Sequence, residues 1–159
     1  MVISKGVAAM DLQFRTMRRQ EFSELEAMMH GLYTEDAEGD PVNRDKIQAT
    51  IRELTQHPEK GRIVMFTMAS DIVGYALVIF YWSNEYSGNI LHIDELFVKS
   101  AWRGQGIATR FFSALPLAGM PSPKALQLEV TPSNPRAQAY YEQLGFQVSV
   151  NAHLVKKMI

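Results

Sequence analysis

The chain has 159 residues, 47% of them hydrophobic, and this length suits one compact domain with a full core. Its 16 basic and 17 acidic residues give a formal net charge of -1, so no overall field attracts nucleic acid or an anionic membrane. The absence of cysteine excludes disulfides, thiolate metal sites and a cysteine nucleophile, and it suits the reducing cytoplasm.

The first part of the chain predicts a strand followed by two helices. Residues 1–10 have too few apolar side chains for a signal peptide, and we expect a flexible leader there; no apolar run reaches membrane-spanning length. Apolar residues alternate over 12–16, which predicts an edge strand. They then recur at helical spacing over 22–32 and 47–54, on either side of an acidic loop over 34–45.

The middle of the chain predicts three strands and a helix. Residues 63–68 and 72–82 are rich in β-branched and aromatic side chains, and the three residues between them suit the turn of an antiparallel hairpin. A further strand over 90–98 leads through a glycine-bearing turn into a helix that ends before Pro116.

The C-terminal part alternates strands with one helix. We expect a strand over 126–130, a helix over 135–144 with proline in its first turn and glycine after its end, and two short strands over 146–158. The two helical crossovers require parallel strand pairs in a sheet that also contains hairpins, so the fold class is α+β with a mixed sheet. Residues 11–159 are expected to form a single domain.

The turn after the strand over 90–98 has the sequence RGQGIA, and it suits a phosphate. N–H groups at the start of a helix point toward one place, and the helix dipole adds positive potential there. Gly104 and Gly106 allow a close approach that side chains would prevent, and Arg103 can donate to phosphate oxygens. An ordinary helix-capping turn is the alternative interpretation.

Two other nucleotide-binding loops fit this turn less well. A Walker loop needs Lys and then Ser or Thr after its second glycine, and the chain has Ile107 and Ala108 there, which excludes ATP and GTP. The dinucleotide fingerprint fits the two glycines and places Glu129 as a ribose acid, but Thr109 replaces its third glycine. An NAD-type dinucleotide therefore remains an alternative ligand.

A second motif, SNPRAQAYYEQLGF, follows over 133–146. Together the two motifs resemble the GNAT superfamily of N-acetyltransferases, closest in character to its small diamine and amino-sugar branches. The acyl-CoA loop of that family reads Arg or Gln, two residues, Gly, one residue, then Gly or Ala, and Arg103, Gly106 and Ala108 match it. The residues that match its second signature are Asn134, Ala137, Tyr141, Glu142, Gly145 and Phe146.

The resemblance implies an α+β GNAT-like fold: a mixed, mostly antiparallel central sheet of about seven strands, with helices on both faces and a splayed parallel strand pair. It implies acetyl-CoA as cosubstrate, with the pantetheine arm between the splayed strands. The residues expected to bind acetyl-CoA are Leu96, Phe97, Val98, Arg103, Gly104, Gln105, Gly106, Ile107, Ala108, Asn134, Ala137 and Tyr140. Because His30, His57 and His153 share no ligand spacing, we expect no metal.

Acetyl transfer to an amine needs a base for the amine and an acid for the departing thiolate. The resemblance assigns the acid to the Tyr141 hydroxyl, and it makes the Leu96 amide the donor to the thioester oxygen. The candidate bases are Asp94 and Glu95, whose order reverses the one common in the family.

Strand alternation separates the two candidate bases. It would place Glu95 on one face with Ile93 and Phe97, where burial raises the pKa of a carboxyl group, and Asp94 on the opposite face. A bulge in this strand would change that division. The sequence therefore leaves open which carboxylate acts, and whether it acts directly or through water.

The acceptor is expected to be a small-molecule amine. Acidic residues over 35–40, and aromatic and acidic residues over 81–86, suit a small cation such as a polyamine or an amino sugar, although solvated loops have a similar composition. Without cysteine to carry the acetyl group, transfer is expected to be direct, in a ternary complex. The alternatives are a non-catalytic acyl-CoA-binding sensor and a protein N-acetyltransferase. We expect no nucleic-acid or membrane partner, and the resemblance favours a cytoplasmic homodimer.

Overall fold

The structure, a computed structural model, describes residues 11–36 and 40–158. The leader expected over residues 1–10 lies outside the described residues. The chain divides after Glu129 into two compact units. A single domain over residues 11–159 stays a prediction.

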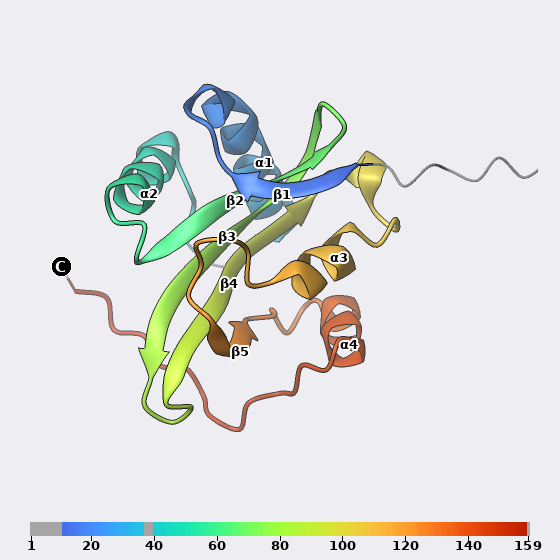
Figure 1. The fold of residues 1–159 in the computed structure, drawn as a ribbon. Helices are drawn as coiled ribbons and strands as arrows, with labels where there is room; N and C mark the ends of the chain where they lie inside the picture. The colour runs from blue at the N-terminus through green and yellow to red at the C-terminus, as the bar shows by residue number, and fades with distance from the viewer. Residues whose placement is uncertain (1–10, 37–39, 159) are drawn as a thin grey trace, which may run out of the picture. The chain divides into compact units, whose positions relative to one another are not determined.

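The first unit is built on one sheet of five strands, in the order β1-β2-β3-β4-β5 (Figure 1). The strands are β1 Leu12–Thr16, β2 Gly61–Met68, β3 Asp71–Ser83, β4 Gly88–Val98 and β5 Pro123–Leu128. Neighbouring strands are antiparallel except β4 and β5, which run parallel. The α+β class and the mixed, mostly antiparallel sheet are therefore confirmed.

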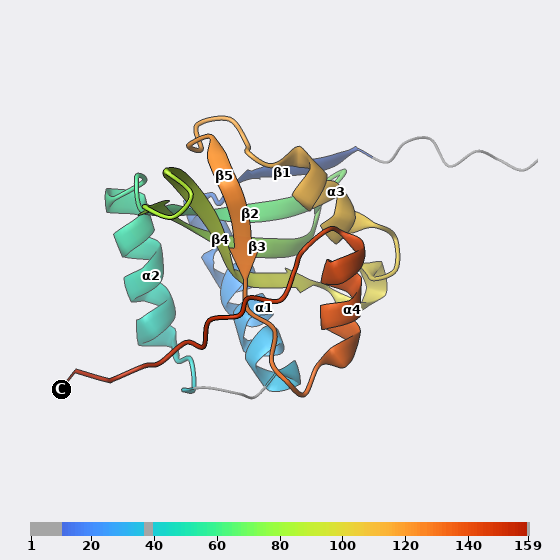
Figure 2. The ribbon, with the colours of Figure 1, turned by 90° about the horizontal axis from the view of Figure 1, so that it is seen from below.

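Helices cover both faces of this sheet, as expected. They are α1 Phe22–Glu35 and α2 Arg44–Gln56 on one face and α3 Ile107–Ala114 on the other (Figure 2). The start of α2 is capped by Asn43, whose side chain accepts a hydrogen bond of 3.0 Å from the Lys46 N–H. Among the described helices, none is long and apolar enough to cross a membrane.

An apolar core lies on each side of the sheet. The core beside α3 includes Phe66, Val78, Ile93, Ile107 and Phe111. The core beside α1 and α2 includes Leu25, Met29, Ile47, Tyr75 and Phe97. Successive strand residues point to opposite faces, so burial of both faces explains why β2 and β3 are apolar along most of their length.

The second unit contains one helix, α4 Pro135–Gln143. As the sequence predicts, proline occupies its first turn, and Gly145 follows its end with a φ of +93° that suits glycine. The Asn134 side chain caps its start, accepting a hydrogen bond of 3.1 Å from the Ala137 N–H.

The sheet has five strands where about seven were expected, and the two short strands expected over 146–158 are corrected. This segment contains no strand in the described part of the chain. Its exposed apolar side chains are Val148, Val150, Leu154, Val155 and Met158. Alternating apolar residues favour extended backbone, but a strand also needs a neighbouring strand to complete its backbone hydrogen bonds, and none of the five described strands pairs with this segment.

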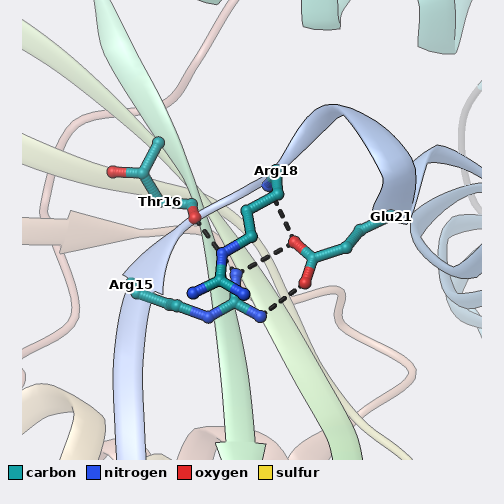
Figure 3. A network of polar contacts seen from close by, with 4 residues as sticks. All are labelled: Arg15, Thr16, Arg18 and Glu21. Atoms are coloured by element: carbon teal, nitrogen blue, oxygen red, sulfur yellow. Dashed lines mark hydrogen bonds and ion pairs between the residues drawn. The ribbon is translucent and has the colours of Figure 1, made fainter.

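A partly buried ion pair fixes the connection from β1 to α1 (Figure 3). Glu21, which is 8% exposed, accepts hydrogen bonds from both terminal nitrogens of the Arg15 guanidinium, one of them at 2.9 Å. The Arg18 N–H donates to the same carboxylate at 2.7 Å. These bonds satisfy a carboxylate that would otherwise be costly to bury, and they hold the first residues of α1 against the sheet.

Glu21→Gln is expected to lower the free energy of unfolding by about 1–3 kcal/mol near neutral pH, because the partly buried Arg15 guanidinium then loses its charged partner. Hydrogen bonding by Arg15 lowers the pKa of Glu21 in the folded protein. Its contribution is therefore present above the ordinary Glu pKa and lost as the pH falls through the lowered native value.

Urea unfolding of wild type and variant at about pH 7 and about pH 3 measures this difference. Glu59→Gln, at a side chain that is 69% exposed, is the matched control and should change little. A Glu21→Gln difference that stayed equal at both pH values would contradict the assignment.

Candidate active site

Strand β4 contains a bulge, and the residues that β4 contributes to the face beside α1 and α2 change at this bulge. Asp94 is an extra residue there, because the register between β3 and β4 shifts at this point. Ile93 packs in the core beside α3, whereas Glu95 lies opposite Leu77 on the face of α1 and α2. The expected common face for Ile93, Glu95 and Phe97 is therefore corrected: only Glu95 and Phe97 share it, because a bulge reverses the alternation beyond it.

Glu95 is a buried carboxylate with two tyrosine partners. Its side chain accepts a hydrogen bond of 2.9 Å from the Tyr33 hydroxyl on Oε1 and one of 2.8 Å from the Tyr75 hydroxyl on Oε2. Tyr33 is half-buried in α1, and Tyr75 is fully buried in β3. Burial raises the pKa of Glu95, and the charge of Asp94 adds to the increase, while the two hydrogen bonds act in the opposite direction.

Further polar side chains continue across this face toward β5. His92 lies opposite Ile79 and Gln127, and its Nε2 is 3.6 Å from Asp94 Oδ1. The neighbouring Asp94 raises the pKa of His92 despite its partial burial. The Tyr81 hydroxyl of β3 donates a hydrogen bond to Gln127 Oε1. Aromatic, imidazole and carboxylate groups thus line one strip across β3, β4 and β5.

The parallel strands β4 and β5 part beside this strip. Their pairing runs from Asn89–Pro123 to Ile93–Leu128, and β4 then continues to Val98 alone on that side. The expected splayed pair is therefore confirmed. The predicted cosubstrate residues Leu96, Phe97 and Val98 all lie in the part of β4 that β5 no longer accompanies.

The glycine turn leads from β4 to α3 in the conformation that its sequence predicts. Gly104 and Gly106 have φ values of +75° and +74°, which a side chain would strain, and a Cβ at either would meet nothing within 4 Å. Gly106 is the cap residue of α3 and brings no side chain to its start. The N–H groups of Ile107 and Ala108 in this first turn are therefore suited to an external anion such as phosphate.

Arg103 has a partner that the sequence did not suggest. Its guanidinium donates two hydrogen bonds, of 2.9 and 2.8 Å, to the Glu35 carboxylate, and its Nε donates one of 2.7 Å to the Val98 carbonyl oxygen. It also stacks over the Phe97 ring at 5.4 Å. Arg103 thereby joins the glycine turn to the end of α1, and donation to a phosphate stays a prediction.

The remaining predicted site residues belong to the second unit. The bond between Asn134 and Ala137 gives these two motif residues a local role as the cap of α4. The rings of Tyr140 and Tyr141 lie 5.3 Å apart, and Phe146 meets Tyr141 edge-on at 5.8 Å. Burial raises the pKa of Tyr141 to about 12, so its hydroxyl is protonated at neutral pH. The base candidates and the glycine turn belong to the first unit.

Sequence reasoning missed the two tyrosines that hold Glu95. Tyr33 and Tyr75 are separated from Glu95 by 62 and 20 positions, and no motif links them. The only available signal was a polar hydroxyl at Tyr75 inside an otherwise apolar strand, which is also common in ordinary cores. Among the described residues, no group of three or more His, Asp or Glu side chains could hold a metal ion.

Comparisons with known proteins agree on one family. Residues 26–146 match the family model described as "Acetyltransferase (GNAT) family". A possible acetyltransferase from Clostridium difficile 630 superposes with a TM-score of 0.77 at 21% identity, over 93% of this chain and 98% of that one. Aminoglycoside N-acetyltransferase AAC(6')-Iy in complex with CoA gives 0.74 at 17% identity, over 97% and 99%.

A ribosomal-protein-alanine N-acetyltransferase from Brucella melitensis biovar Abortus has a TM-score of 0.71 at 16% identity, over 92% of this chain and 99% of that one. No curated protein sequence matches the chain. At these identities the solved structures share the fold with this chain, while their acceptors differ from one another.

Proposed function

The chain belongs to the GNAT family of acetyltransferases, and on that premise we propose that it transfers the acetyl group of acetyl-CoA directly to a small cationic amine. The observation that carries this proposal is the buried carboxylate of Glu95 at the bulge of β4, beside the point where β4 and β5 part. A carboxylate there can take a proton from an amine while the thioester lies along the open part of β4.

The residues present fit acetyl-CoA, which supplies the acetyl group as a thioester. The open backbone of residues 96–98 would bind the pantetheine arm, and the turn over 103–108 would bind the pyrophosphate through N–H groups at the start of α3. Asn134, Ala137 and Tyr140 would complete the cosubstrate site, by resemblance to the family. The Leu96 N–H would donate to the thioester oxygen and stabilise the charge that develops there.

Glu95 would act as the base. The acceptor amine has a pKa of about 10.4 if it resembles lysine, so it must lose a proton before it attacks. The ammonium group first gives one proton to the Glu95 carboxylate, directly or through water, and the neutral nitrogen then forms the new bond to the acetyl carbon as the carbon–sulfur bond breaks. The second proton that the nitrogen loses balances the one that the sulfur gains. The Tyr141 hydroxyl would give a proton to the departing sulfur. Because the chain has no cysteine, no thiol of the protein carries the acetyl group between the two substrates.

Charge and aromatic surface favour a small cation as acceptor. Asp94 is half exposed beside the base, and Trp82 and Tyr86 are exposed on the hairpin between β3 and β4. An aminoglycoside N-acetyltransferase shares the fold, which makes amino sugars a precedent alongside polyamines. We place the enzyme in the cytoplasm, without nucleic-acid or membrane partners, in keeping with its net charge of -1 and its lack of cysteine. By resemblance to the family, we expect a homodimer.

Thermal melts with acetyl-CoA, CoA or NADH test the cosubstrate first. A ligand at about 100 times its dissociation constant stabilises by about 2.7 kcal/mol, which raises Tm by roughly 5–10 °C for a chain of this size. We expect both CoA compounds to raise Tm and NADH to leave it unchanged. A shift with NADH alone would replace the proposal with a dinucleotide binder.

Thiol release in the presence of polyamines, amino sugars and N-terminal peptides then tests the acceptor. We expect release with a polyamine or an amino sugar. Release only with a peptide would identify a protein N-acetyltransferase. Binding of CoA without turnover on any amine would favour a non-catalytic sensor.

A further inference from the structure

The Glu95 carboxylate is held from two sides. Tyr33 donates to one oxygen from α1 at 2.9 Å, and Tyr75 donates to the other from β3 at 2.8 Å. A carboxylate bonded through both oxygens to two different elements has little freedom to rotate. The position of the carboxylate is therefore set by the packing of α1 on the sheet.

The approach of α1 to the sheet is close enough to allow this contact. A Cβ at Gly31 would lie 3.2 Å from the Phe97 ring, so glycine lets the last turns of the helix rest directly on β4. Glu35 in the same part of the helix bonds to Arg103. These contacts hold the end of α1 where the Tyr33 hydroxyl reaches Glu95.

The chemical nature of the two donors matters for a base. An arginine or lysine partner would stabilise the charged carboxylate so strongly that it would accept protons poorly. In the described residues, none of the ion pairs includes Glu95. Arg103, whose guanidinium lies over the Phe97 ring, is bonded to Glu35. Phenol hydroxyls are neutral donors, and burial raises the pKa of both tyrosines, so they remain protonated.

From this geometry we propose that Tyr33 and Tyr75 are positioning residues for Glu95, which orient its carboxylate and stabilise its charged form against burial. The inference rests on the proposed function, in which Glu95 is the base. Without the two donors, burial and Asp94 would favour the protonated carboxyl, which cannot accept a proton from the amine.

The other groups near Glu95 do not replace the tyrosines. On β4, Asp94 carries a like charge and opposes ionisation. The side chains that α2 contributes to this core are the apolar Ile47, Ile51 and Leu54. The carboxylates of α1 that form ion pairs are Glu24 with Lys99, Glu26 with Arg44, and Glu35 with Arg103.

The test measures kcat/KM against pH for Tyr33→Phe and Tyr75→Phe. Each substitution removes one hydrogen bond that lowers the pKa of Glu95, so the acidic limb of the profile should move to higher pH by about 0.5–1 unit. The rate on the plateau above that limb should remain within about threefold of wild type. Thr55→Val, at an exposed position of α2 whose hydroxyl bonds only to the Ile51 carbonyl oxygen, is the control for loss of a hydroxyl and should leave the limb in place.

A carbon-13 NMR titration of the glutamate carboxyl carbons provides a readout that needs no acceptor. The Glu95 signal is assigned by its loss in Glu95→Gln, and its midpoint should rise in both tyrosine variants. An unchanged midpoint in both would overturn the proposal. If Tyr75→Phe does not fold, Tyr33→Phe decides alone, because Tyr33 is only half-buried.

The two readouts also separate this inference from the proposed function. A raised NMR midpoint in a protein that acetylates no amine would support the positioning role and reject the enzyme assignment. A normal acidic limb and an unchanged midpoint in an active enzyme would reject the positioning role alone.

Discussion

Glu95→Gln is expected to lower kcat by about 10²–10⁴-fold near neutral pH, the usual size of a general-base contribution, with little change in affinity for acetyl-CoA. Glutamine has nearly the same shape but cannot take a proton from the amine. Steady-state rates and calorimetric titration with acetyl-CoA separate the two effects.

The stability of Glu95→Gln provides an internal check. Burial raises the pKa of Glu95 in the folded state, so the wild type loses stability as the pH rises from the unfolded pKa through the folded one. Glutamine does not titrate, and the variant should therefore be at least as stable as wild type near neutral pH. A low rate in a stable variant would locate the defect in the chemistry.

Asp94→Asn is the comparison for this experiment, since Asp94 is the other candidate base and is half exposed at the bulge. We expect a smaller loss of kcat there, together with a higher KM if the carboxylate attracts the cationic acceptor. A collapse of kcat in Asp94→Asn with a normal rate in Glu95→Gln would transfer the role of base to Asp94.

Tyr141→Phe is expected to reduce kcat by about 10²-fold or more, with the dissociation constant for acetyl-CoA changed by less than about threefold. The departing thiolate has a pKa near 8.5 by analogy with cysteine, and a hydroxyl with a pKa of about 12 is protonated and available as its acid at neutral pH. Phenylalanine keeps the ring contacts with Tyr140 and Phe146 but removes the proton.

The measurement is a pH profile of kcat for Tyr141→Phe beside direct binding of acetyl-CoA. Thr55→Val, at an exposed position of α2, serves as the control for loss of a hydroxyl. Equal activity of wild type and Tyr141→Phe across the whole pH range would remove Tyr141 from the role of acid.

Local patterns in the sequence were sufficient to predict the helices and the first five strands. Apolar alternation marked β1, and β-branched and aromatic content marked β2 and β3. Helical spacing marked α1 and α2, and proline and glycine marked the ends of α4. The glycine turn and the second motif are also local, because each depends on the conformation of a few consecutive residues. For that reason they sufficed to indicate the family.

Contacts between distant residues decided the chemistry of the site. The bulge at Asp94 is a mismatch between β4 and β3, so a pattern within β4 alone wrongly placed Ile93 on the face of Glu95. The hydrogen bonds from Tyr33 and Tyr75 exist only after α1 has packed on the sheet.

Contacts between distant residues also explain why the partner of Arg103 and the structure of residues 146–158 differ from the predictions. Arg103 could donate to any nearby anion, and only the folded position of α1 brings Glu35 within 2.8 Å of it. Residues 146–158 have a strand-like pattern, but a strand requires a partner that their own sequence does not specify. Secondary structure here followed from local residue preferences, whereas side-chain partners depended on which segments the tertiary structure brings together.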